Sequence, residues 1–391
     1  MKNTMPENPK VKEVLRRFEQ LKAERTVYEG PWQNIRHLVR PGTSDFTTYQ
    51  SPGSTRTDNI YDGTAPQALR DLASALQTNL VNPTDRWFSL ETQDMRRLKD
   101  DQESLEWLDV ASDIMFDEYA NPAVNHQSAM HEIFLDIGAF GTGTVYQEWN
   151  PASGHLLFRT YPLAGTHIAE NNKGLVDTMY RFCQFTRRQL EQEFGKENLP
   201  RQVIENTDET RQWEVIHAVY PRADRNPAKY TPENMRFASC WVLKEHGHLL
   251  KEGGFKSFPY HVVRWEKLAG EVYGRGPAIN CLPDIRMLNK MEFTLLKMAQ
   301  KVADPPIIAP NDGFLGQVKT FPGAVMYKEP GSDPLDVLEL KANLPYAEEK
   351  AEQKRDTIRS AFFSEWVKLE RKKARQTAYE ISEKIEEQLR M

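Results

Sequence analysis

Five cations lie close together near the end of the sequence, where together they could bind a polyanion. They belong to the stretch FFSEWVKLERKKARQTAYEI, in which Glu370 is the one acid between Trp366 and Gln376. The cations are Lys368, Arg371, Lys372, Lys373 and Arg375. A nucleic acid duplex, which carries one negative charge per ~1.7 Å of its axis, would attract such a cluster. Pairing with neighbouring acids, or exposure on a solvated linker between helices, explains the same residues equally, so both interpretations stay open.

The glycine-rich stretch GAFGTGT, residues 138–144, is a second pattern that could do chemistry, because glycine loops can bind phosphates. It lacks the Gly-Lys-Ser/Thr ending of a nucleotide-binding loop. It also follows a helical pattern and precedes a strand pattern. A phosphate site needs the opposite order, since the N-terminus of a helix is its positive end. We therefore predict a structural turn here.

Histidine and cysteine spacing gives no sign of a metal centre. His126 and His131 are five residues apart with Glu132 beside them, whereas a zinc-binding helix needs histidines at i and i+4 with a glutamate between. The cysteines form no CxxC pair, which fits a reducing compartment, and lie at Cys183, Cys240 and Cys281. No Gly-x-Ser-x-Gly elbow is present. We expect no catalytic residues, no metal and no cofactor, and therefore not an enzyme.

Composition restricts where a nucleic acid could bind. The 391-residue chain is 39% hydrophobic and 27% charged, with a formal net charge of −5 and a pI near 6.1. An acidic protein cannot hold nucleic acid over its whole surface, so any such contact must be local. No run of 18 apolar residues exists, and the N-terminus MKNTMPENPKVKEV has no apolar core of a signal peptide. We expect neither a membrane span nor secretion.

The periodicity of apolar residues predicts an α+β protein, with strands between two groups of helices. Helices are expected at residues 9–40 (broken near Gly30-Pro31), 64–82, 101–119, 125–138, 277–303, 345–365 and 376–390. Strands are expected at 144–149, 155–161, 175–185, 213–220, 238–245 and 259–265, with a hairpin tip at 245–247. The stretch 41–63 is rich in Ser, Thr, Gly and Pro and is expected to be a long loop.

One helix carries a seam of apolar residues that could pack against other helices. Its members recur at intervals of three and four, in the pattern of a coiled coil, and are Leu288, Met291, Leu295, Met298 and Val302. At 1.5 Å per residue, this seam of about 20 residues is about 30 Å long. Such a seam suits packing between subunits, and it suits an ordinary core helix equally well.

Five segments, taken in order, resemble the portal or head-to-tail connecting proteins of short-tailed bacteriophages. They are NIYDGTAPQALRDLASALQTNLVNPTDRWFSL (59–90), GAFGTGTVYQEW (138–149), VYGRGPAINCLPDIRMLN (272–289), DPP…PGAV (304–325) and ARQTAYEISEKIEE (374–387). The resemblance covers nearly the whole chain. It implies a ring-shaped subunit assembly, a dodecamer, at one capsid vertex of the virion.

The resemblance also implies partners and modules. DNA would be driven through the channel by a terminase large subunit and leave it past a tail adaptor protein, with major capsid and scaffolding proteins as further partners and assembly in the host cytoplasm. The implied modules are a wing (1–210), a β-rich clip (211–275), a stem helix (276–304), a β-rich wing segment (305–344) and wing helices (345–391). The sequence stops at Met391, so we expect no crown after them.

By this resemblance, the five cations lie on a tunnel loop that spans about residues 364–375. The loop precedes the segment Thr377-Ala378-Tyr379-Glu380 and would project into the channel. Copied around a ring, its cations would contact double-stranded DNA without reading its sequence. The alternative from another functional class is a nucleic-acid-binding clamp that acts as a monomer or dimer.

Overall fold

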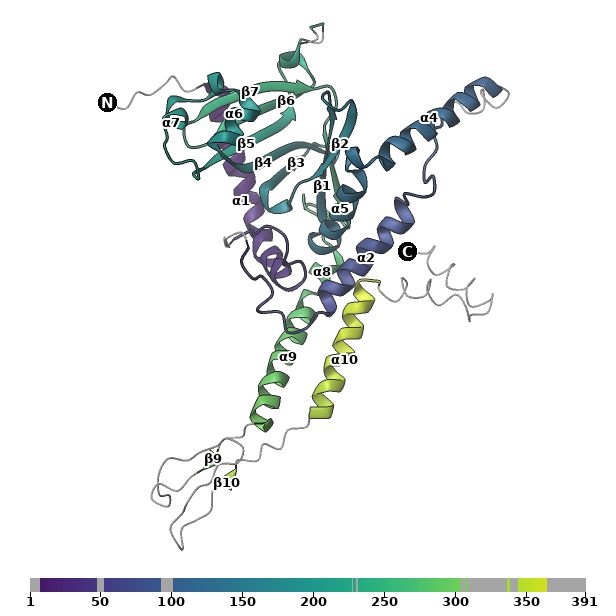
Figure 1. Cartoon of the computed structure of the whole chain (residues 1–391), viewed down its shortest axis with the longest axis vertical. Coiled ribbons are helices and arrows are strands. Elements are labelled where there is room, and N and C mark those ends of the chain that lie inside the picture. The colour runs from purple at the N-terminus through teal and green to yellow at the C-terminus, as the bar shows by residue number, and fades with distance from the viewer. Residues whose placement is uncertain are drawn as a thin grey trace.

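The protein has a body made of two sheets and the helices packed on them. The computed structural model describes residues 8–47, 53–92, 101–226, 228–229, 231–303, 307–308, 336–337 and 344–363. Figure 1 shows helix α4 and a pair of helices, α9 and α10, extending from this body in different directions. The antiparallel sheets between groups of helices confirm the predicted α+β class. None of the described helices combines the length and the apolar character that crossing a membrane requires.

The larger sheet has five antiparallel strands in the order β3-β4-β5-β6-β7. Helix α1 covers one face, where Phe18 packs with Ile216 and Val242. Helix α6 covers the other face, where Leu190 packs with Val215. Adjacent residues of β5 thus point to opposite faces, as the two-residue period of a strand requires. The elements are α1 (Pro9–Leu38), β3 (Thr166–Glu170), β4 (Val176–Thr186), α6 (Arg187–Phe194), α7 (Arg201–Ile204), β5 (Gln212–Pro221), β6 (Phe237–Leu243) and β7 (His248–Phe255).

The smaller sheet has three antiparallel strands in the order β2-β1-β8. Helix α5 packs on it, with Ile133 and Phe134 in one cluster with Val145 and Phe158 of the sheet. Helix α2 packs in turn on α5. The elements are α2 (Thr64–Leu80), α4 (Gln102–Ala120), α5 (His126–Phe140), β1 (Thr142–Asn150), β2 (His155–Thr160) and β8 (Tyr260–Arg264).

The strands within residues 211–275, the range expected for the clip, take part in both sheets. Strands β5 to β7 continue the sheet that β3 and β4 begin, and β8 pairs with β1. Val219, Phe237 and Tyr260 from these strands share one core with residues of α1 and α2. The sheets thus join residues on both sides of position 211, and the division into modules stays a prediction.

Helix α1 runs unbroken past Pro31, where the sequence predicted a break. Proline removes the hydrogen bond to the carbonyl of residue 27, but Val27 is 82% exposed, so water can satisfy that carbonyl. The next residue, Trp32, is 1% exposed, stacks with Tyr28 and meets Tyr273 edge-on. Burial of this indole outweighs the missing hydrogen bond.

The helix predicted at 277–303 is divided in two at Cys281. The parts are α8 (Pro277–Asn280) and α9 (Leu282–Ala303). Pro283 thus lies in the first turn of α9, a position where the missing amide proton costs little. The remaining elements are α10 (Leu344–Ala361), the paired strands β9 (Ile307–Ile308) and β10 (Asp336–Val337), and 3-10 turns at Pro122–Val124, Leu163–Gly165, Lys196–Asn198 and Pro232–Asn234. The helix predicted at 376–390 lies outside the described residues.

Candidate functional site: the helical arm

Helices α9 and α10 lie side by side as an antiparallel pair, which we call the arm (Figure 1). At the end of the arm next to the body, Leu288 is buried in the same core as Ala351 and Ile358 of α10. The other end carries β9 and β10, which pair through Ile308 and Asp336 (Figure 1). The arm therefore has one end fixed in the body and one end remote from it.

The five predicted seam residues meet different surroundings along the arm. Leu288 is buried, Met291 and Leu295 are partly buried against the core, Met298 is half-buried, and Val302 is 51% exposed. Within the described residues, the core therefore covers the seam near the body and leaves its distal end open. Packing of this seam against another subunit stays a prediction.

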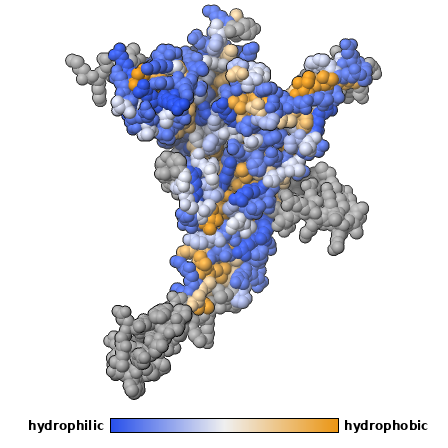
Figure 2. All heavy atoms as spheres, viewed as in Figure 1, coloured by the Kyte–Doolittle hydropathy of each residue, from blue (hydrophilic) through white to orange (hydrophobic). Residues whose placement is uncertain are grey.

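The arm has a groove along each of its two flanks, and the two grooves differ in chemistry. We call the first the apolar groove; its lining is Met287, Lys290, Met291, Thr294, Leu295, Met298 and Ala347. We call the second the acidic groove; its lining is Tyr61, Glu292, Leu295, Leu296, Ala299, Pro345, Glu348, Glu349, Glu352 and Arg355. Figure 2 shows apolar surface reaching the exterior on the arm, where Met287 is 51% and Leu296 49% exposed.

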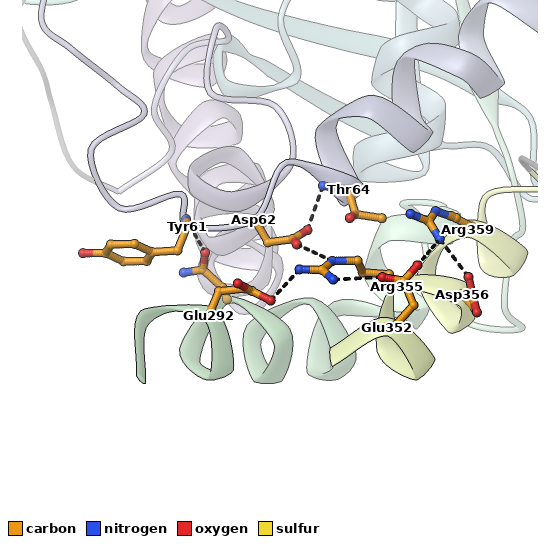
Figure 3. A network of polar contacts seen from close by, with 9 residues as sticks. Tyr61, Asp62, Thr64, Glu292, Glu352, Arg355, Asp356 and Arg359 are labelled. Carbon is orange, nitrogen blue, oxygen red and sulfur yellow. Dashed lines mark hydrogen bonds and ion pairs between the residues drawn. The ribbon is translucent and has the colours of Figure 1, made fainter. Parts of the chain in front are cut away.

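A network of ion pairs centred on Arg355 fixes the arm to the body (Figure 3). Its guanidinium donates to Asp62 at 2.9 Å, to Glu292 of α9 at 2.5 Å and to Glu352 of its own helix at 2.9 Å. Asp62 precedes α2, and it also accepts a hydrogen bond from the Thr64 amide at 2.8 Å. One side chain thus joins α10, α9 and the start of α2.

The pKa shifts of Asp62 and Arg355 agree with this network. Burial alone would raise the pKa of Asp62, but hydrogen bonds from Thr64 and Arg355 outweigh burial and hold that pKa below its usual value. The pKa of Arg355 is raised, first by its hydrogen bond to Asp62 and then by that to Glu352. Both groups are therefore charged at neutral pH, and the pair is ionic.

The glycine-rich stretch 138–144 is a structural turn, as predicted. Gly141 ends α5 with φ of 75°, a conformation that favours glycine. A side chain at Gly141 would collide with the backbone of Arg275 and Gly276. The carbonyl of Gly141 accepts a hydrogen bond from the Trp265 amide at 2.9 Å. The turn is thus filled by protein backbone, which leaves no space for a phosphate.

The histidines considered as metal ligands have structural surroundings. His126 is buried and stacks against Tyr119 and Trp87, and burial lowers its pKa. The Nδ1 of His131 lies 2.8 Å from Oε1 of Gln77. In the part of the chain that the structure describes, no three His, Cys, Asp or Glu side chains are placed to hold a metal ion.

Sequence reasoning did not find the Asp62–Arg355–Glu292 network. Asp62 and Arg355 are separated by 293 residues, and no local spacing signals that they meet. The predicted DNA-contacting residues, Lys368 to Arg375, lie outside the described residues. Of the two helices expected to flank the tunnel loop, the structure describes α10, and the role of the five cations stays a prediction.

Comparison with known proteins identifies the family. Residues 11–391 match the model of the bacteriophage head to tail connecting protein family. The chain belongs to this family. The connector is 29% identical over 399 residues to the "Probable portal protein" of Bordetella phage BPP-1, which covers 99% of this chain and 71% of the relative. It is also 29% identical over 323 residues to the "Portal protein" of Salmonella phage epsilon15, which covers 80% of this chain and 57% of that relative.

Segments that carry the sequence resemblance are in contact in this connector. The segment 59–90 supplies Asp62 to the network around Arg355. The segment 138–149 supplies Gly141, which packs on Gly276 from the segment 272–289. These stretches therefore join the body to the arm, and their glycines and acids have structural explanations that need no ligand.

Proposed function

We propose that this connector is the subunit of the portal ring at one vertex of a phage capsid. Genomic DNA is packaged through the central channel of the ring and leaves through it at infection. The ring is a dodecamer in the virion, assembles in the host cytoplasm with major capsid and scaffolding proteins, and docks the terminase large subunit and the tail adaptor. The family match over residues 11–391 carries this proposal. The role is mechanical and electrostatic, and the connector itself catalyses no reaction.

Exposed apolar surface supports assembly from several copies. Both grooves of the arm are open, and Met287, Leu296 and Val302 remain about half exposed. Helix α4, which projects from the body in Figure 1, exposes Trp107 (67%) and Ile114 (64%). Apolar surface of this extent marks contacts with other molecules. Since the two grooves lie on different flanks, one copy can contact a neighbour on each side, which is the arrangement that closes a ring.

The fold suggests a revised assignment of the modules. The body, with both sheets, corresponds to the wing, and the arm corresponds to the stem, which then contains α10 as well as α9. The clip that docks the adaptor is the segment between α9 and α10, residues 304–343, in place of 211–275. Support comes from the antiparallel course of the arm, because α9 leads away from the body and α10 leads back (Figure 1).

The tunnel loop at about 364–375 follows directly from the C-terminal end of α10. Phe363 has φ of 56°, which turns the chain out of the helical course, and its ring lies 6.1 Å from that of Trp265. The contact of Phe363 with Trp265 supports a loop that starts near the body. Replacing all five loop cations by glutamine should lower DNA retention and leave ring assembly unchanged; rings that fail to form would give the loop a structural role instead.

Imaging of the purified connector tests the proposed function. Negative-stain micrographs should show annular particles with a central hole, and the mass in solution should be a multiple of the 45.2 kDa chain. The alternative, a nucleic-acid clamp, predicts compact monomers or dimers that bind DNA. Observation of such particles alone, under conditions that support DNA binding, would reject the portal assignment.

A further inference from the structure

Helix α4 carries only acidic charge, and most of its surface is exposed. Six of its 19 residues are acids, none is a lysine, arginine or histidine, and only Ser112 is buried. Figure 2 shows apolar surface on this helix, where Trp107, Val110 and Ile114 are each more than half exposed. At about 100° per residue, these three side chains lie within an arc of about 60°. They form one apolar row, which we call the α4 ridge.

Two acids accompany the α4 ridge and have no cationic partner among the described residues. Glu103 lies one helical turn before Trp107 on the same side of the helix, and Glu106 lies next to Trp107 in the sequence. Both are exposed, and neither forms an ion pair in the described part of the chain. A surface that covers this ridge must therefore offer apolar contact and positive charge together.

A pocket of about 620 Å³ on the body has this combination of properties. It lies beside the start of β3, which pairs with β4 only from Thr166, opposite Arg181, and so leaves the edge of β4 beyond Arg181 uncovered. The loop after α1 and the turn before β3 form its walls. Its aromatic and cationic lining is Phe46, Arg56, Tyr161, Arg181 and Phe182. We call it the arginine pocket.

Arg181 is a partly buried cation without an acidic partner among the described residues. Its Nε is buried and has no hydrogen-bond partner. The guanidinium lies over the ring of Tyr161 at 3.9 Å and over that of Trp241 at 5.2 Å. These contacts engage the faces of the guanidinium, whereas its N–H donors lie in its plane. A partly buried charge without a counter-ion is costly, so an anion in the pocket would be favourable.

The second arginine of the pocket leaves its positive charge unbalanced as well. Arg56 donates a 2.8 Å hydrogen bond to the backbone carbonyl of Thr43, and it forms no ion pair within the residues that the structure describes. Asp45, which also lines the pocket, already pairs with Arg36 at 2.9 Å. The arginine pocket is therefore positive, and it can accept carboxylates beside an apolar side chain.

We propose that the α4 ridge of one copy enters the arginine pocket of a neighbouring copy. Trp107 packs there on the aromatic lining, and the carboxylates of Glu103 and Glu106 accept charge-assisted hydrogen bonds from the two arginines. Figure 1 shows α4 projecting from the body away from α1 and β4, so the helix cannot fill the pocket of its own chain. The inference rests on the proposed portal function, because a contact between two different surfaces, repeated from copy to copy, can close a ring.

Charge exchange in the full-length connector tests this contact. Glu103→Arg combined with Glu106→Arg should weaken subunit association about tenfold or more in sedimentation velocity, while circular dichroism stays unchanged because both positions are exposed. Arg56→Glu alone should also weaken association. Combined with the reversal on α4, it should restore part of the loss, since opposite charges then meet again. Glu205→Arg with Glu209→Arg, two exposed acids away from α4, is the control and should associate like wild type.

Crosslinking locates the contact directly. Val110→Cys on the ridge and Ser44→Cys at the pocket are placed on separate chains. Both chains also carry Cys183→Ser, because Cys183 is a half-buried free thiol that lines the pocket. After joint assembly, a short bis-maleimide should join the two chains into a covalent dimer on a denaturing gel. Asp109→Cys, on the side of α4 opposite the ridge, is the matched partner for Ser44→Cys and should give no dimer.

Three results overturn the proposal. The first is association at wild-type strength when both acids of the ridge are reversed. The second is weakened association that Arg56→Glu does not restore, because the ridge then binds another surface. The third is an assembled connector without crosslinks between positions 110 and 44. Each of these leaves the proposed portal ring in place as long as annular particles form. A wild-type connector that forms no rings removes the proposed function, and this inference fails with it.

Discussion

The Nε of Arg355 donates a 2.9 Å hydrogen bond to Asp62, across 293 residues of sequence. Asp62 is 9% exposed at its side chain, and Arg355 is 25% exposed. The contact joins the second half of α10 to the residues just before α2, and the same guanidinium also holds Glu292 of α9. One guanidinium therefore helps to fix the arm to the body, together with the core that Leu288 shares with Ile358.

Replacement of Arg355 by methionine should loosen the arm. Methionine would keep the aliphatic part of the Arg355 side chain. Asp62 and Glu292 would lose the cation that they bind, although both carboxylates are partly buried. We expect the free energy of unfolding to fall by about 1–3 kcal/mol. Amide hydrogen exchange in α10 should become faster. Arg359→Met is the control, because the partners of Arg359 are 51% and 61% exposed, and it should cost less than about 1 kcal/mol. Equal losses in both variants would show that the network does not hold the arm.

A charge in the apolar groove should prevent ring assembly without unfolding the subunit. Met287 is 51% exposed, so Met287→Glu leaves the core of the subunit intact. In a ring, the same carboxylate would be buried against a neighbour at a cost of several kcal/mol. We expect monomers with wild-type circular dichroism and few annular particles in negative stain. Gln353→Glu, on the exposed side of α10, should assemble normally. Normal rings from Met287→Glu would exclude the groove from the subunit interface.

Substitution of Gly141 by alanine should be severely destabilising. Its φ of 75° disfavours a side chain, and the added methyl group would meet the backbone of Arg275 and Gly276. We expect a loss of about 3 kcal/mol or more, measured by urea unfolding. Gly154→Ala is a matched control, because Gly154 has a similar φ of 71° but no neighbouring atom within 4 Å. It should cost about 1–2 kcal/mol, from the backbone strain alone. Similar losses at both positions would contradict close packing at Gly141.

Stability should fall on acidification because of His167. Burial, and then the positive charge of Arg25, lower the pKa of this histidine to about 3. In the unfolded chain the pKa returns to about 6.5, so below that pH the unfolded state binds a proton that the folded state rejects. From pH 7.5 to 5.0 this histidine should remove about 2 kcal/mol of stability.

His167→Phe tests this linkage. The variant should lose about 2 kcal/mol less than wild type over the same pH interval, measured by urea unfolding. Phenylalanine keeps a ring next to Phe18, whose centroid lies 4.9 Å from the imidazole. His246→Phe, at an exposed position, should keep the wild-type pH dependence. An unchanged pH dependence in His167→Phe would refute the assignment.

Local sequence patterns predicted most helices and strands of this connector, because the spacing of apolar residues and the positions of turn-forming residues are local properties of the sequence. Helix α2 and strands β1, β2, β4 and β5 lie where periodicity placed them. Strands β3 and β7 were missed, since β3 has five residues and β7 contains Gly253 and Gly254. The break expected at Pro31 is absent because burial of Trp32, a tertiary effect, outweighs the local signal.

Less of the candidate site than of the fold could be predicted from the sequence. The spacing of apolar residues predicted the seam from Leu288 to Val302. It could not predict which part of the seam α10 would cover. Arg355 is one arginine in a helix of mixed charge, and its partners Asp62 and Glu292 lie far away in sequence. Strand partners were equally hard to predict, since pairing of β8 with β1 joins residues more than 100 positions apart.

The arm enters and leaves the body at neighbouring points, since α9 starts and α10 ends there (Figure 1). Whatever chain links their far ends can therefore change in length or sequence without disturbing the strands or the glycine turn. In the proposed portal ring, where this link is the clip, a phage lineage could exchange it to suit a new tail while the body keeps its place in the capsid. Specificity for the tail and attachment to the capsid would then evolve independently within one polypeptide.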